Sequence, residues 1–215
     1  MKHLTSVVTA AAVAGLCVAV SARTANTSSP APAAQLMLDP NSWKIDGGHS
    51  SPTFAVKHLV VATVRGRLGP ISGTVWYDGK NVSAIRVDAT IDVKGFSTGN
   101  DARDSDLRGP DFFAVDRHPA MTFKSKRVEG IEAGRFKLIG DLTIRGITKE
   151  VTLTVEGPSP IVKGQRDQRV AATATTTINR FDFGLKYNSL LETGGAVVAT
   201  DVNVTIDIEA TKPLG

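Results

Sequence analysis

The chain has 215 residues, of which 41% are hydrophobic, and it carries a formal net charge of +4. This size and hydrophobic fraction fit one globular domain with a packed core. The positive charges are scattered, without the dense block of Lys and Arg that is typical of a nucleic-acid surface, so we expect no nucleic-acid partner.

The first 22 residues have the pattern of a signal peptide. A polar start with Lys2 and His3 precedes an apolar run between Val7 and Val20, which is too short for a comfortable membrane span. Small residues before and at Ala22 favour cleavage after that position, although an uncleaved anchor is an alternative. We therefore expect an exported protein, located in the periplasm, the cell envelope or outside the cell.

The single cysteine, Cys17, lies inside this predicted signal peptide. Leu16 precedes it where a lipoprotein cleavage site requires a small residue, so we do not expect a lipid-modified cysteine. The mature chain would then have no disulfide, no thiol nucleophile and no thiolate metal site. Residues 23–40 are rich in Ser, Thr, Ala and Pro and predict a flexible linker, followed by one domain over residues 41–213.

Most of that domain alternates apolar and polar residues, as β-strands do. The clearest segment is 84–93, where alternate positions from Ile85 to Val93 are apolar and the positions between them are polar. Comparable patterns predict strands at 43–46, 54–56, 60–68, 71–77, 121–128, 135–144, 151–155, 170–178 and 201–210, with a polar loop at 157–168. Twenty glycines, ten prolines and many Thr and Val residues also favour an all-β fold.

Residues 100–113 form the only stretch of the domain that reads as helix. Asn100 is a suitable N-cap, Asp101 and Asp104 place negative charge in the first turn, and Arg108 places positive charge in the last turn. A Gly-Pro pair beginning at Gly109 is a stop signal. The sequence therefore predicts one short helix over about 101–108, which we expect to close or shape one end of a β-barrel.

A barrel follows from the absence of alternating helices. Parallel strands need crossover connections, and this sequence has none. An antiparallel sheet of about eight long strands must protect its edges, and closure into a barrel removes them while leaving room for packed side chains or one ligand. We predict an all-β, eight-stranded antiparallel barrel; a two-sheet sandwich is the alternative.

Five segments, taken in order, resemble the YceI-like family. They are 43–46 (WKID) with 49–50 (HS), Phe54 and 57–59 (KHL); 103–104 (RD) with 107–108 (LR) and 111–113 (DFF); 118–123 (HPAMTF); 140–149 (GDLTIRGITK); and 178–180 (INR) with 181–184 (FDFG). The resemblance spans 43–210 and implies an extended, lipocalin-like barrel in an exported bacterial protein that holds a long isoprenoid or other amphiphile in an apolar tunnel. Family members often carry a histidine just before the leucine of the helix, and Asp106 occupies that position here.

The residues themselves are compatible with such a tunnel. Short side chains at Ala89, Ala172 and Ala174 would leave space inside a barrel, and each buried CH₂ of a polyprenyl chain would contribute about 0.8 kcal/mol. The alternative is a structural module whose inward side chains fill the core. We expect transport or storage of an isoprenoid lipid, polyprenyl compound or quinone. The predicted lining residues are Phe54, Phe112, Phe113, Phe123 and Phe181.

Two arginines are candidates for contact with the polar part of a ligand. Arg103 and Arg108 are predicted to contact a polar head group such as a pyrophosphate, with helix capping and surface ion pairs as alternative roles. Arg180 is interpreted as a structural residue in a turn, paired with Asp182.

The histidines give a second hypothesis. His49 and His58 are candidate ligand-binding residues, and either could act as a base in an enzyme for a small hydrophobic substrate. Neither has a partner within a recognisable catalytic motif, and the chain contains no Ser-His-Asp arrangement, phosphate loop or nucleophile elbow. We therefore expect no enzymatic activity, no metal and no cofactor. Contact with a membrane surface and pairing into a homodimer stay open.

Overall fold

The computed structural model describes residues 39–189 and 197–214. The predicted signal peptide, most of the predicted linker and the cleavage position near Ala22 lie outside these residues. In the described part of the chain, α2 (Asp101–Arg108) is the only α-helix, and no helix there is long and apolar enough to cross a membrane.

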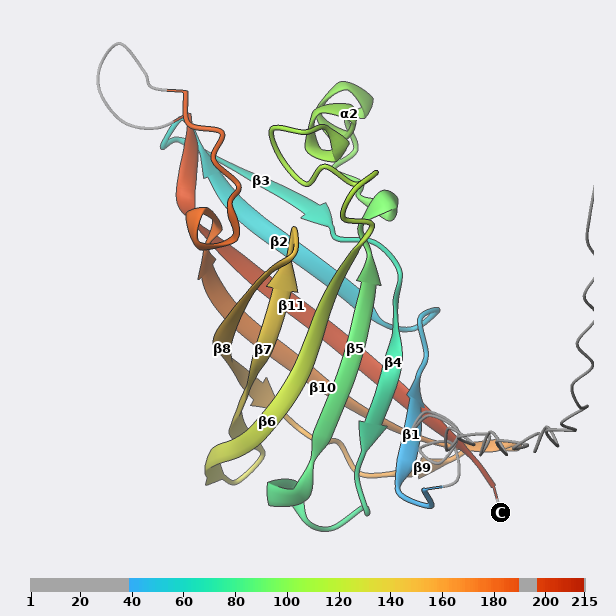
Figure 1. The fold of residues 1–215 in the computed structure, drawn as a ribbon. Helices are drawn as coiled ribbons and strands as arrows, with labels where there is room; N and C mark the ends of the chain where they lie inside the picture. Colours follow the sequence, from blue (N-terminus) through green and yellow to red (C-terminus); the bar gives the residue numbers. More distant parts are fainter. Residues whose placement is uncertain (1–38, 190–196, 215) are drawn as a thin grey trace, which may run out of the picture.

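One antiparallel sheet makes up the body of the molecule (Figure 1). Its strands are β1 (Ser42–Ile45), β2 (Ser51–His58), β3 (Ala62–Arg67), β4 (Ile71–Trp76), β5 (Arg86–Asp92), β6 (Ala120–Glu132), β7 (Arg135–Ile144), β8 (Ile147–Glu156), β9 (Val162–Lys163), β10 (Asp167–Asn179) and β11 (Val198–Pro213). Their order is β3-β2-β11-β1-β4-β5-β6-β7-β8-β10-β9, and β11 also pairs with β10. That extra pairing closes a ring of eight strands, β1, β4, β5, β6, β7, β8, β10 and β11, so the predicted eight-stranded barrel is confirmed and the sandwich is excluded.

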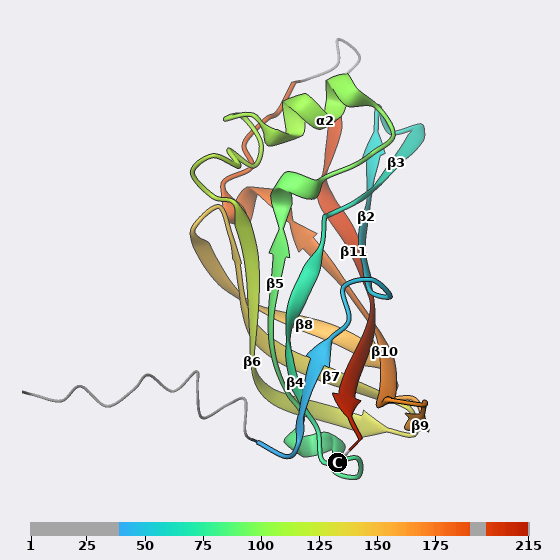
Figure 2. The same ribbon diagram turned by 90° about the vertical axis from the view of Figure 1, so that its right-hand side faces the viewer.

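β11 is the seam of this barrel. One edge pairs with β10 through thirteen residue pairs. The other edge pairs with β1 at Ala210 and Thr211, and with β2 between Val198 and Asp207. The β2–β3 hairpin therefore extends the wall beyond β1, toward the end of the barrel at which α2 lies (Figures 1 and 2).

Helix α2 begins and ends where the sequence predicts. The side chain of Asn100 accepts a hydrogen bond from the backbone N–H of Arg103 at 2.9 Å, and Gly109 donates back to the last turn. The carboxylate of Asp104 is buried and accepts from the backbone N–H of Thr98 at 2.9 and 3.1 Å. The cap and this buried carboxylate therefore fix the helix relative to the loop that precedes it.

Some local structure was not predicted. β9 lies inside the segment predicted as a loop, and it pairs with the start of β10 at Gln168 and Arg169. Three single-turn 3₁₀ helices also form: η1 (Val82–Ala84), η2 (Val93–Gly95) and η3 (Arg180–Phe183). Each begins after an Asn or Asp whose side chain accepts a backbone N–H, which is a common local competitor of strand geometry.

The core divides into two groups of buried side chains. The group toward α2 includes Phe96 and Phe183, both 1% exposed, and the ring of Phe96 packs on Phe113 with centroids 4.4 Å apart. The group toward the opposite end includes Trp43, whose indole N–H donates to the carbonyl of Tyr77 at 2.8 Å. Many residues of both groups also line the cavity described next.

Candidate functional site

A long, narrow cavity of about 230 Å³ lies inside the barrel. One water molecule needs only roughly 10–15 Å³ of such space. The wall is almost entirely aliphatic and aromatic, from Tyr77 and Ile85 at one end to Leu107 and Phe112 beneath α2. A cavity with so few polar partners holds water poorly and suits a hydrocarbon chain.

Strand alternation builds this wall. In β10, every second residue from Val170 to Ile178 lines the cavity, and in β11 every second residue from Val202 to Ala210 does so. The small side chains predicted to leave space, Ala89, Ala172 and Ala174, all lie in the wall. The cavity argues against the filled-core alternative.

Four of the five predicted phenylalanines line the cavity, namely Phe54, Phe112, Phe113 and Phe123. Phe181 is placed elsewhere: it is half-buried, and its ring covers the guanidinium carbon of Arg180 at 4.2 Å. Of the two phenylalanines in the segment 181–184 (FDFG), the one buried in the core is Phe183.

Two of the lining rings lie directly over glycines. A Cβ on Gly66 would come within 2.6 Å of Cε1 of Phe54, and a Cβ on Gly140 would come within 2.6 Å of Cζ of Phe123. The missing side chains let both rings lie close against the barrel wall. The cavity therefore owes part of its width to these glycines.

A second hollow of about 560 Å³, which we call the mouth, adjoins the cavity beneath α2. Phe54, Val56, Leu107, Phe112 and Val198 belong to both walls. The rest of the mouth is lined by His58, Val64, Arg103, Ser105, Asp106, Gly109, Pro110, Asp111, Tyr187 and Val197. An apolar cavity beside a mouth that adds polar and charged side chains matches the two chemical halves of an amphiphile.

The two candidate arginines have different positions. Arg103 lines the mouth, and it donates to the hydroxyl of Thr98 at 2.7 Å and to its carbonyl at 3.0 Å. A guanidinium has five N–H donors, so Arg103 keeps donors for a ligand. Arg108 donates to the carbonyls of Lys94 at 3.1 Å and Phe96 at 2.8 Å, which ties α2 to η2. It lines neither the cavity nor the mouth.

Arg180 is a wall residue that sequence reasoning placed only in a turn. It is 3% exposed, and its guanidinium donates to the carbonyls of Leu185, Val198 and Ala199 at 2.7, 3.1 and 2.9 Å, and to that of Tyr187. Burial lowers the pKa of Arg180. Arg180 was expected to pair with Asp182, but its guanidinium binds these carbonyls instead. The hydrogen bonds connect the chain after η3 to the start of β11.

That fastening has an effect at the mouth. Tyr187, one of the residues held by Arg180, stacks on Phe112 with centroids 4.9 Å apart. Phe112 lines both the cavity and the mouth, so this stack forms part of the boundary between them. The sequence motif at residues 179–184 marks Arg180 as a candidate. It could not reveal the carbonyl partners of Arg180, because those residues lie outside the motif.

The description "YceI-like domain" fits residues 43–210, which match the family model over that whole stretch. The chain belongs to the YceI-like family. A UPF0312 protein of Staphylococcus aureus (strain bovine RF122 / ET3-1) is 38% identical over 170 residues, covering 78% of this chain and 96% of that protein.

Solved YceI-like structures share the fold. The Campylobacter jejuni YceI protein has a TM-score of 0.61 and 30% identity, with 73% of this chain and 89% of that chain covered. BcnA of Burkholderia cenocepacia has a TM-score of 0.65 and 22% identity, covering 77% and 98%. A polyisoprenoid binding domain from Saccharophagus degradans has a TM-score of 0.59 and 17% identity, covering 80% and 98%.

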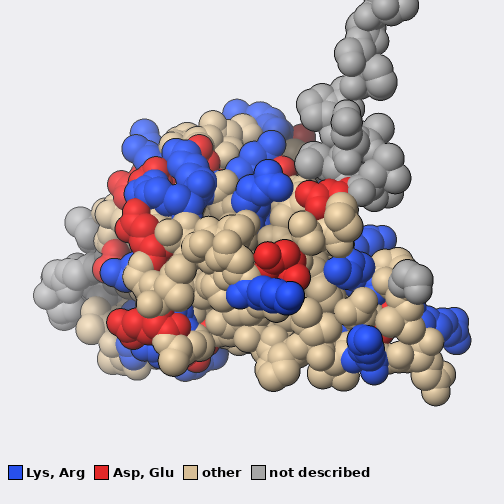
Figure 3. Space-filling model, turned by 90° about the horizontal axis from the view of Figure 1, so that it is seen from below, with Lys and Arg blue, Asp and Glu red and all other residues tan. Residues whose placement is uncertain are grey.

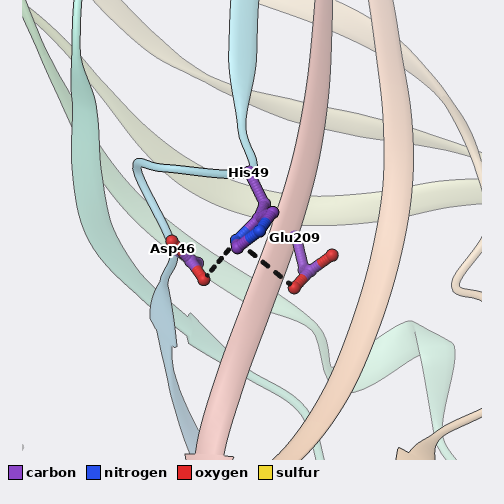
Figure 4. Close-up of side chains that lie close together, drawn as sticks. All are labelled: Asp46, His49 and Glu209. Atoms are coloured by element: carbon purple, nitrogen blue, oxygen red, sulfur yellow. Dashed lines mark hydrogen bonds and ion pairs between the residues drawn. The ribbon is translucent and has the colours of Figure 1, made fainter.

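The two candidate histidines of this YceI-like chain lie in different places. His58 lines the mouth, whereas His49 belongs to a charged cluster on the outer surface (Figure 4). Nδ1 of His49 lies 2.8 Å from Oδ2 of Asp46 and 3.9 Å from Oε1 of Glu209. Glu209 points outward because its neighbours in β11, Ile208 and Ala210, line the cavity. The two histidines therefore form no acid–base pair.

No partner for either histidine was expected within motif distance, but His49 is hydrogen-bonded to Asp46, three residues before it. This bond is the main cause that raises the pKa of His49 and lowers the pKa of Asp46. The pair lies outside the barrel, on the other side of the wall from the cavity. It cannot act on a molecule held inside.

The side chains of this cluster are close enough together to bind a metal ion, but an arginine already lies beside the carboxylates. The ligand atoms of Asp46, His49 and Glu209 all lie within 4.8 Å of one another. However, Arg169 donates to Glu209 and lies 3.9 Å from Oδ2 of Asp46. Because the guanidinium already neutralises these carboxylates, we interpret the cluster as an ion-pair network that joins β10 and β11 to the turn after β1.

Proposed function

We propose that this YceI-like protein binds one long apolar chain, an isoprenoid lipid, polyprenyl compound or quinone. The tail would lie in the cavity and the polar head at the mouth, near Arg103 and His58. The observation that carries the proposal is an apolar cavity that adjoins a mouth lined by both apolar and polar side chains. The name of the Saccharophagus degradans neighbour, a polyisoprenoid binding domain, supports the same ligand class.

The length and chemistry of the cavity support a chain-like ligand. The lining residues of β10 from Val170 to Ile178 cover roughly 26 Å along the strand, at about 3.3 Å per residue. At about 0.8 kcal/mol per buried CH₂, ten such groups supply about 8 kcal/mol, the free energy of a micromolar complex before the costs of association are subtracted. An isoprenoid of several units exceeds that number of carbons.

The biological role follows from the ligand and the N-terminal pattern. Residues 1–22 would direct export, residues 23–40 would act as a linker, and the barrel would carry or store its lipid in the periplasm, the envelope or outside the cell. Such a protein performs no chemical step on its ligand, and we expect no turnover. Transport and storage share the same binding event, so the first test concerns binding.

Organic extraction of the purified protein, followed by mass spectrometry, should identify an isoprenoid or another long-chain lipid. A titration with a polyprenol and a quinone, followed by tryptophan fluorescence, should saturate. Replacing Ala174→Leu places a larger side chain in the cavity, and we expect at least about tenfold weaker binding if two or more CH₂ contacts are lost.

The matched control is Thr175→Leu, the exposed neighbour of Ala174 on the same strand. It adds a similar side chain on the outer face and should leave the affinity unchanged. No extracted lipid together with no uptake of either probe would refute the proposal. Equal affinity of the two variants would show that binding occurs outside the cavity.

A further inference from the structure

The tip of the β2–β3 hairpin, residues 59–61, exposes three consecutive aliphatic side chains. Leu59 is 37% exposed, Val60 70% and Val61 81%. His58 and Val64, on the two sides of this hairpin tip, line the mouth. A run of exposed aliphatic residues at such a place normally has a function, because it adds nothing to the core.

The backbone of the hairpin tip is also unfavourable for these residues. Leu59 has φ 51° and Val60 has φ 63°, which is the left-handed region. Glycine or asparagine adopts this conformation at little cost, whereas a β-branched valine there is an outlier. Strain of this kind is common where a side chain serves recognition.

The charge of the hairpin is of one sign. Lys57, Arg65 and Arg67 are exposed on β2 and β3, and residues 47–77 contain no Asp or Glu. Across the mouth, the helix side carries the exposed acids Asp106 and Asp111. An anionic surface would therefore attract the hairpin and repel the opposite rim.

Other parts of the surface lack this combination. The end of the barrel away from α2 carries cationic and anionic side chains next to one another (Figure 3). The other large aliphatic side chains exposed in the described part of the chain, Ile131, Ile147, Val162 and Leu214, are single residues. Within the described ranges, consecutive exposed aliphatic residues whose neighbouring charges along the chain are all positive occur at the hairpin tip alone.

We propose that the hairpin tip docks the protein on a bilayer that contains anionic lipids. Val60 and Val61 enter the headgroup region, and Lys57, Arg65 and Arg67 contact the lipid phosphates. The hairpin side of the mouth then lies next to the membrane. This inference rests on the proposed function, since docking gives an apolar chain a route between bilayer and cavity that avoids water.

Vesicle co-sedimentation tests the docking. The full-length mature protein should bind phosphatidylcholine vesicles that contain phosphatidylglycerol more tightly than phosphatidylcholine vesicles alone, and added salt should weaken the binding. The double variant Val60→Asn/Val61→Ser and the double variant Lys57→Gln/Arg65→Gln should each bind the anionic vesicles about tenfold less. The matched control Ile131→Ser removes an exposed aliphatic residue of β6 and should bind like the wild type.

Two lipid assays separate this inference from the proposed function. The Val60→Asn/Val61→Ser variant should bind a polyprenol delivered from solvent with wild-type affinity, yet take it up from anionic vesicles several-fold more slowly. A wild-type protein that docks on anionic vesicles but binds no polyprenol would refute the proposed function and leave the docking supported.

Two results would overturn the inference. The first is wild-type binding of the tip variant to anionic vesicles. The second is a tip variant that changes from dimer to monomer in solution without any change in vesicle binding, because the hairpin tip would then be an interface between two copies of this chain.

Discussion

Gly66 and Gly140 matter at the residue scale because each lies under an aromatic ring of the cavity wall. At Gly66, the atoms that a Cβ would meet all belong to side chains, Cε1 and Cζ of Phe54 at 2.6 and 2.9 Å and Cγ2 of Thr98 at 2.8 Å. Contacts under 3.0 Å require something to move. The ring of Phe54 can move only away from Gly66, so a larger residue at 66 would reshape the cavity.

Gly66→Ala should therefore destabilise the protein by about 1–3 kcal/mol, the usual cost of overpacking, and weaken lipid binding. Denaturant unfolding and the tryptophan titration measure the two effects. The double variant Gly66→Ala/Phe54→Leu should recover part of the loss, because the smaller side chain removes the conflict. A Gly66→Ala protein as stable as the wild type would show that the ring is not seated on the glycine.

The charged cluster around His49 predicts a pH-dependent stability. The hydrogen bond and charge of Asp46, together with the charge of Glu209, raise the pKa of His49 above 6.5, while the charge of Arg169 opposes them. A raised pKa in the folded state stabilises the fold fully below 6.5, and this contribution is lost as the pH rises through the folded-state value. The lowered pKa of Asp46 acts in the opposite sense: its contribution is present above 3.8 and is lost as the pH falls through the folded-state value.

His49→Gln should therefore lower the melting temperature most at about pH 5, which lies between the ordinary pKa values of Asp46 and His49. The effect should be smallest above about pH 8, which lies above both values. Thermal unfolding of both proteins across this range measures the difference. The control His58→Gln removes a histidine outside the cluster and should show no such trend. A His49→Gln effect that grew above pH 8 would contradict the assignment.

At the scale of elements, prediction from sequence succeeded where local signals decide the structure. Helix α2 has its cap, charges and stop signal within residues 100–110. β5 follows from strict alternation, and β7 from alternation that is interrupted only at its centre. β9 and η3 could not be found this way. β9 depends on two pairs with β10, and η3 turns Phe183 rather than Phe181 into the core, which the motif alone does not show.

The β2–β3 hairpin gives the prediction that belongs to this scale. Because Val60 has φ 63°, Val60→Asn should stabilise the protein by about 1 kcal/mol, since asparagine tolerates the left-handed region. Denaturant unfolding measures this gain. Val61→Asn is the matched control and should give none, because Val61 is not among the residues with positive φ. Equal effects of the two substitutions would mean that the turn is not strained at Val60.

At the scale of the whole molecule, the sequence predicted a closed barrel but could not by itself predict a hollow one. Inward rows such as Ile85 to Val93 alternate in the same way whether a barrel is filled or open. The resemblance to the YceI-like family supplied that expectation. The mouth was also beyond sequence reasoning, because β2, α2 and the segment containing Tyr187 meet there only through the closure of the sheet.

A ligand that occupies the cavity should stabilise the entire barrel. At a free concentration of about 100 times Kd, binding adds about 2.7 kcal/mol, which for a domain of this size corresponds to a rise in Tm of about 5–11 °C. Thermal unfolding with and without a polyprenol measures the rise. Ala174→Leu should reduce it and Thr175→Leu should not. An unchanged Tm at saturating ligand would indicate that the ligand binds the unfolded chain as well as the native protein.

The position of the seam sets the order in which the barrel can acquire its contents. β11 is paired with strands at the start of the domain, and Ser50 contacts Glu209 across 159 positions of the chain. Contacts between such remote segments form late in folding and slowly. During synthesis the earlier strands can associate, but no enclosed space exists until the last strand arrives. The proposed lipid would therefore have an enclosed cavity to bind only after β11 has paired with β1, β2 and β10.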